Sequence, residues 1–75
     1  MIGYILIGLE NTNEQDILSM LLDNPVVKEG NILFGEWDII LKVETENPEA
    51  LGAFVVDHVR NIPGIKLTST LISAK

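Results

Sequence analysis

A short run of residues near the middle of the chain carries the groups best suited to hold a small polar ligand. Gly35, Trp37 and Asp38 follow one another closely. The carboxylate of Asp38 can meet an ammonium group, and a turn that contains glycine exposes backbone N–H donors that suit an anion. The ring of Trp37 suits a pocket wall, an interface or plain sheet core. The simpler alternative is that Gly35 is only a turn residue and Asp38 a solvated strand end.

Hydroxyl groups recur near the end of the chain. Thr68 and Thr70 share one face of an expected strand, and Ser69 lies on the other. The threonines could bind the polar head of a ligand across an interface, although ordinary β-propensity is the simpler account. His58, the only histidine, has neither a nucleophile nor an orienting acid at helical spacing, because the adjacent Asp57 points elsewhere. We therefore expect His58 at a helix edge or an interface, and we predict no catalytic residue.

The composition argues against several kinds of site and partner. The chain has 75 residues, no cysteine and a net charge of −6. The lack of cysteine excludes disulfides and thiolate metal sites, and the acidic residues do not have the spacing of a calcium loop. Phosphate binding needs clustered lysine and arginine, and this chain has no basic run. We expect no metal, no cofactor, no direct nucleic-acid contact and no membrane contact, and a cytoplasmic location.

The first half of the chain predicts a strand, a helix and a hairpin. The apolar run Ile2–Leu9 is typical of a central strand buried on both faces. A helix follows, capped by Thr12 or Asn13 and ended by Pro25. Its packed stripe comprises Ile17, Leu18, Leu21 and Leu22. The hairpin has strands from about Val27 to Phe34 and from Trp37 to Thr45, a tight connection at Gly35-Glu36, and one face made of Trp37, Ile39, Leu41 and Val43.

The second half predicts one more helix and one more strand. Asn47-Pro48 is a strong helix start, and Asn61–Gly64 stops the helix. Its apolar face comprises Leu51, Phe54, Val55, Val59 and Ile62, with His58 at the edge. The last strand runs from Ile65 to Ser73.

The order of these elements predicts an α+β, ferredoxin-like βαββαβ fold, with two helices on one face of a four-stranded antiparallel sheet. Residues 1–75 form a single domain in this interpretation. The other sheet face has no element left to cover it, and 47% of the residues are hydrophobic. We therefore expect the sheet of another subunit to pack there, so that the chain works as a homo-oligomer.

Four short motifs, in this order and spacing, resemble one known family. They are Phe34–Val43, Leu51–Phe54, Ile62–Ile65 and Thr68–Ile72. Together they resemble the C-terminal effector domain (RAM domain) of the Lrp/AsnC, or feast/famine, transcription regulators. These regulators carry an N-terminal helix-turn-helix, and here nothing precedes the first strand. The resemblance is therefore to a stand-alone effector domain, and DNA binding is not carried over.

The resemblance implies a dimeric α/β barrel made by two sheets packed face to face, with dimers joined into rings. It also implies that an amino acid or similar metabolite binds at the junction between dimers, where Gly35 and Asp38 help to form the site and the strand with Thr68 and Thr70 lies beside it. We expect an oligomeric amino-acid sensor that can co-assemble with a full-length regulator. The alternatives are a small monooxygenase-like enzyme of the same topology and an assembly module without a ligand.

Overall fold

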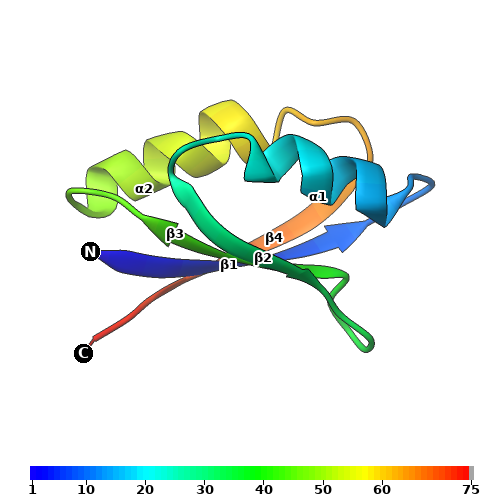
Figure 1. Cartoon of the computed structure of the whole chain (residues 1–75), viewed down its shortest axis with the longest axis horizontal. Coiled ribbons are helices and arrows are strands. Elements are labelled where there is room, and N and C mark those ends of the chain that lie inside the picture. The colour runs from blue at the N-terminus through cyan, green and yellow to red at the C-terminus, as the bar shows by residue number, and fades with distance from the viewer. Residues whose placement is uncertain (75) are drawn as a thin grey trace.

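The computed structural model describes residues 1–74 and has two layers, with the helices above a single four-stranded sheet (Figure 1). The strand order is β2-β3-β1-β4 and every pairing is antiparallel. This architecture confirms the ferredoxin-like prediction. The elements are β1 (Ile2–Leu9), α1 (Glu14–Leu22), β2 (Val27–Ile32), β3 (Ile39–Glu44), α2 (Pro48–Phe54), the π-helical turn η1 (Val55–Val59) and β4 (Ile65–Ile72).

Asparagine side chains start both α-helices. The Oδ1 atom of Asn13 accepts a hydrogen bond from the Asp16 N–H at 3.1 Å, and Oδ1 of Asn47 accepts one from the Ala50 N–H at 2.8 Å. Each bond satisfies a backbone donor that has no partner inside its own helix. Of the two predicted caps of α1, Asn13 is the one used.

The second helix differs from the prediction in its last turns. It is α-helical only to Phe54 and continues as the wider π-helix η1, in which the Arg60 N–H donates to the Val55 carbonyl at 2.9 Å. This is a bond between residues five apart, so the turn holds one more residue than an α-helical turn. Val55 and Val59 stay buried, which explains why the apolar stripe alone did not reveal the change.

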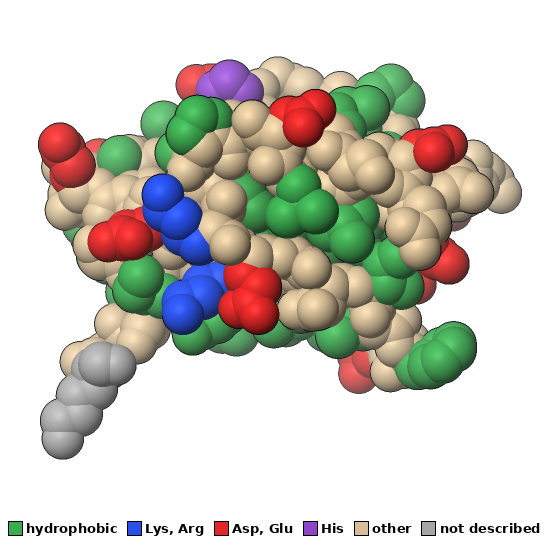
Figure 2. Space-filling view, in the orientation of Figure 1, with side chains coloured by type: hydrophobic (Ala, Val, Ile, Leu, Met, Phe, Trp, Pro, Cys, Tyr) green, Lys and Arg blue, Asp and Glu red, His purple; other side chains and the backbone are tan. Residues whose placement is uncertain are grey.

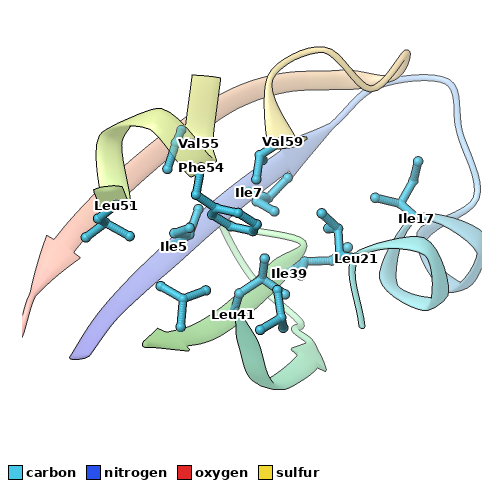
Figure 3. Packing of buried hydrophobic residues seen from close by; sticks show 12 residues of the cluster. Ile5, Ile7, Ile17, Leu21, Ile39, Leu41, Leu51, Phe54, Val55 and Val59 are labelled. Atoms are coloured by element: carbon cyan, nitrogen blue, oxygen red, sulfur yellow. The ribbon is translucent and has the colours of Figure 1, made fainter. Parts of the chain in front are cut away.

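The core lies between the helices and one face of the sheet. Alternate residues of the two central strands, Ile5, Ile7, Ile39, Leu41 and Val43, are fully buried. The ring of Phe54 points from α2 onto this row between Leu51 and Leu21, and Ile17 extends the cluster farther along α1 (Figure 3). The helix packs so closely that a Cβ atom at Gly3 would lie 2.7 Å from a methyl carbon of Leu51.

The hairpin connection is longer than predicted. β2 ends at Ile32 and β3 begins at Ile39, so the expected tight turn at Gly35-Glu36 is wrong. The Leu33 N–H donates to the Asp38 carbonyl at 2.9 Å, and this bond closes the loop.

Trp37 lies in this loop and not in β3, so the prediction that it shares the face of Ile39 is also wrong. Its Cε3 atom is 3.9 Å from the position that a Cβ atom on Gly8 would take. Gly8 alternates with the buried Ile7, so its Cβ direction is away from the helices. The indole ring is therefore on the side of the sheet opposite the helices.

That second side of the sheet, which we call the open face, is not covered by any element of residues 1–74. Its central side chains, from Tyr4, Leu6 and Ile40, are half-buried. Leu67 and Leu71 of β4 are 57% and 51% exposed. Figure 1 shows both helices above the sheet, and Figure 2 shows hydrophobic side chains along the lower edge of the molecule. Within one subunit, β1 is thus buried on one face, not on both as predicted.

The core predicts a clear contrast between two substitutions. Leu41→Ala removes a fully buried side chain and should lower the free energy of unfolding by roughly 2–5 kcal/mol. Met20→Ala, at a side chain that is 54% exposed on α1, should change it by less than about 0.5 kcal/mol. Urea unfolding at one fixed protein concentration measures both, and equal effects would contradict this account of the core.

Candidate functional site

Asp38 ties the hairpin loop to the end of the central strand. Its Oδ2 atom accepts a hydrogen bond from the Leu9 N–H at 2.7 Å, and its own N–H donates to the Ile7 carbonyl at 2.9 Å. The β1–β4 register shifts between Gly8 and Leu9, and at this bulge the carboxylate pairs with the backbone donor of Leu9. Asp38 is half-buried, so it is not the solvated strand end of the simpler alternative. Its other oxygen, Oδ1, keeps the capacity to accept from a cationic ligand.

Gly35 lies at the exposed tip of the same loop, which projects from one end of the sheet (Figure 1). Its φ is +134°, a conformation that side chains disfavour, and nothing lies within 4 Å of the position of a Cβ atom. The neighbouring Phe34 is fully exposed. The turn role of Gly35 is therefore clear, and the space around it is open to a ligand or to another subunit.

Thr68 and Thr70 lie on one face of β4, as the alternation predicted. They pair with Ile7 and Ile5 of β1, whose side chains face the helices, so the threonines face that side as well. Thr68 is half-buried and Thr70 is exposed. The helices thus leave the outer edge of β4 uncovered.

The five predicted residues surround the end of β1 and do not line one pocket. Asp38 bonds to Ile7 from the β3 side, and Thr68 pairs with Ile7 from the β4 side. Two strand spacings separate these residues, which is roughly 10 Å. Trp37 lies beside Gly8 on the open face, away from the threonines. One subunit alone therefore presents these candidate residues as two separate groups.

A hollow that the sequence did not reveal lies where η1 meets the start of β4. Its volume is about 340 Å³, and it is lined by Arg60, Ile65, Lys66, Leu67 and Thr68. Thr68 is the one predicted site residue among these. One feature of the sequence could have pointed to this hollow. Arg60 and Lys66 are cations on either side of the Pro63-Gly64 turn in an acidic chain.

His58 is exposed, and its ring lies 5.8 Å from that of Phe54 at the edge of η1. It borders a second hollow of about 340 Å³ between α1 and η1. None of the lining residues carries a hydroxyl or a thiol; they are Met20, Leu21, Asn24, Phe54, Asp57, His58, Asn61, Ile62 and Pro63. Tyr4 is on the open face, so it does not reach this hollow. The hollow brings His58 no hydroxyl or thiol nucleophile, and Asp57 is the acidic residue that lines it with His58.

Within residues 1–74, no three histidine or acidic side chains gather in a way that could hold a metal ion. In the same part of the chain, no helix has the length and apolar character that crossing a membrane requires.

Residues 3–75 match the family model of the Lrp/AsnC ligand binding domain. The chain belongs to the Lrp/AsnC family. An uncharacterized HTH-type transcriptional regulator of Pyrococcus abyssi is 37% identical over 60 residues, which are 80% of this chain and 40% of that protein. The HTH-type transcriptional regulator FL11 of Pyrococcus horikoshii is 31% identical over 75 residues, all of this chain and 49% of FL11. This Lrp/AsnC domain thus spans less than half the length of these curated relatives.

A solved structure of similar size shares the Lrp/AsnC fold. The crystal structure of FFRP-DM1 superposes with a TM-score of 0.90 at 36% sequence identity. The match covers 96% of this chain and 96% of that one.

The bond between Asp38 and Leu9 predicts a specific loss of stability in this Lrp/AsnC domain. Asp38→Ala removes a hydrogen bond to a charged acceptor and should cost roughly 1.5–3 kcal/mol. Glu36→Ala, in the exposed part of the same loop, should cost less than about 0.5 kcal/mol. Hydrogen exchange of the Leu9 amide measures the local effect, and unchanged protection in Asp38→Ala would count against the bond.

Proposed function

We propose that this domain is the effector-binding module of an Lrp/AsnC-type transcription regulator, and that it holds an amino acid or a related small metabolite where subunits of an oligomer meet. Three observations support the proposal. The family model is that of a ligand-binding domain, and the relatives are named as transcriptional regulators. The candidate residues form two separate half-sites on one subunit, so a second subunit is needed to close a pocket.

The observation that carries the oligomer is the open face. Leu67 and Leu71 are each more than half exposed there, beside the half-buried Tyr4 and Leu6. Full burial of an exposed leucine contributes about 1.5–3 kcal/mol, so burial of the exposed half of each contributes roughly half of that. The same face of a second copy is apolar too, and a two-fold contact brings identical surfaces together. Two sheets packed in this way make the dimeric α/β barrel.

The charges around the open face fit this arrangement. Glu29 and Lys42 are paired residues of β2 and β3, and Glu44 is exposed at the end of β3. These groups lie toward the β2 edge, while the large exposed leucines lie on β4. The apolar residues thus extend from the central strands to the β4 edge of the face, and the charged residues lie toward the opposite, β2 edge, where a polar rim is usual in protein interfaces.

The half-sites have the chemistry that an amino acid requires. Oδ1 of Asp38 can accept from the ammonium group, and the exposed turn at Gly35 offers backbone donors to the carboxylate. The hydroxyl of Thr70, exposed at the uncovered edge of β4, can complete the pocket from a neighbouring subunit. A transcriptional regulator of Neisseria meningitidis with the same fold, at 20% identity and a TM-score of 0.88, was solved as a complex with L-methionine.

A ligand that bridges two subunits stabilises the assembly that it bridges. In this proposal the metabolite changes the population of an assembled form. Co-assembly with a full-length regulator of the family would pass that change on to DNA, since the relatives are of the HTH type.

The oligomer proposal is tested on the open face. Leu71→Asp places a charge in its apolar part and should convert the protein to a folded monomer, because an unpaired charge cannot be buried without a large penalty. Met20→Asp adds the same charge at a similarly exposed residue of α1 and should leave the assembly unchanged. Light scattering coupled to gel filtration measures the mass. A monomeric unsubstituted chain would overturn the proposal.

Calorimetry and thermal unfolding with each of the twenty amino acids test the sensing role. A ligand at 100 times its Kd should stabilise the folded state by about 2.7 kcal/mol. Asp38→Asn should weaken binding about tenfold or more, because it removes the charge that faces the ammonium group. Glu36→Gln removes a neighbouring charge as its control. The absence of heat and of any thermal shift, in a folded oligomeric sample, would contradict sensing of amino acids.

A further inference from the structure

We infer that the hollow between η1 and β4 binds the oxyanion group of a small metabolite, a carboxylate or a phosphate, through Arg60, Lys66 and Thr68. These three side chains are the hydrogen-bond donors among the residues that line its 340 Å³. Ile65 and Leu67 complete the wall. All of these residues belong to one subunit, and of them Leu67 also belongs to the open face.

The distribution of charge supports an anion at this place. The chain has eleven acidic and five basic residues. Within residues 1–74, no acidic oxygen lies within 4.0 Å of the guanidinium of Arg60, and Lys66 has one at that limit. An unpaired arginine beside a second cation, in a chain of net charge −6, leaves a local positive potential that attracts an anion.

Lys66 has a weak partner. Its Nζ atom is 4.0 Å from Oε1 of Glu10, and the two side chains are 57% and 61% exposed. Exposed pairs of this kind contribute little and are screened by salt. An anionic ligand can therefore replace Glu10 as the partner of the Lys66 ammonium group at a small cost in free energy. The negative charge of Glu10 opposes the approach of that anion.

The fold holds the donors on regular elements. Arg60 caps η1, with its N–H bonded to the Val55 carbonyl at 2.9 Å. Thr68 pairs with Ile7 and faces the helix side of the sheet, and Lys66 lies at the bulge where the β1–β4 register shifts between Gly8 and Leu9. The Glu10 N–H donates a hydrogen bond to the Gly64 carbonyl at 2.8 Å, and this bond fixes the segment between η1 and β4.

These groups complement an oxyanion in geometry as well as in charge. A guanidinium presents two parallel N–H donors that match two oxygens of a carboxylate or phosphate. The Thr68 hydroxyl makes no hydrogen bond to another side chain or to the backbone of residues 1–74, so it is available as a third donor. Arg60 also lies at a helix C-terminus, where a cation favours the dipole. That role affects stability and gives Arg60 no preference for an anion.

This anion site deepens the proposed function. It rests on that function only at Thr68, which is a candidate residue in both. A ligand that used both sites would need an oxyanion group for Arg60 in addition to the carboxylate bound at the Gly35 turn. The two ideas fail separately, because anion binding by one subunit should persist in the monomeric Leu71→Asp variant. Binding of an effector at a subunit junction should be lost in the same variant.

Nuclear magnetic resonance titration of the whole protein tests the site, with inorganic phosphate and with succinate at constant ionic strength. We expect saturable shifts of the Arg60, Lys66 and Thr68 amides. The anion that binds with the lower Kd shows whether the oxyanion group of the metabolite is a phosphate or a carboxylate. Arg60→Gln should weaken binding about tenfold or more, as expected for a lost charge-assisted hydrogen bond.

Two further variants separate a built site from general charge effects. Glu10→Gln should tighten binding several-fold, since it removes the acid that competes for Lys66. Lys28→Gln removes an exposed cation of β2, outside the hollow, and should have no effect. Circular dichroism checks that each variant is folded. Amides that do not shift with either anion, or equal weakening by Lys28→Gln and Arg60→Gln, would overturn the inference.

Discussion

Two short helices have to cover a four-stranded sheet, and this limit on area shapes the whole molecule. α1 and the α2–η1 segment bury one face of the central strands, where Ile5, Ile7 and Leu41 reach complete burial. They do not reach the outer edge of β4, where Thr70 and Ile72 stay exposed on the helix side. No element of residues 1–74 covers the opposite face of the sheet. The open face, the exposed threonine and the hollow beside Arg60 all follow from this shortage of cover.

Asp38 has a structural role that makes a binding role possible. Its carboxylate and its backbone fix the hairpin loop to the last residues of β1 through Leu9 and Ile7. A loop with a positive-φ glycine at its tip would otherwise sample many conformations. Ordering it in advance reduces the entropy that a ligand or a neighbouring subunit would lose on binding. In the proposed function, Oδ2 of this side chain holds the loop and Oδ1 is left for the ligand.

The sequence predicted those features that depend on local patterns. Alternation identified the buried face of β3 through Leu41 and Val43, and cap chemistry located both helix starts. The hairpin loop was misjudged because Trp37 continues the apolar alternation, whereas the Ile7 carbonyl of a distant strand accepts the Asp38 N–H. The hollow could not be foreseen, because Arg60 and Lys66 belong to different elements that only the tertiary fold brings together. The π-helical turn left the stripe of buried valines intact and so gave no periodic signal.

That turn has a consequence for how relatives can diverge. An α-helical turn holds 3.6 residues, and the wider π-helical turn takes up one residue more before the chain faces the same way again. Arg60 is the first residue beyond the turn. A homologue with one residue fewer at this point could close the turn as α-helix, keep the packing of Phe54 on the sheet and still present the residue after the turn to the hollow. The turn thus lets a single insertion or deletion occur here in evolution without any substitution in the core.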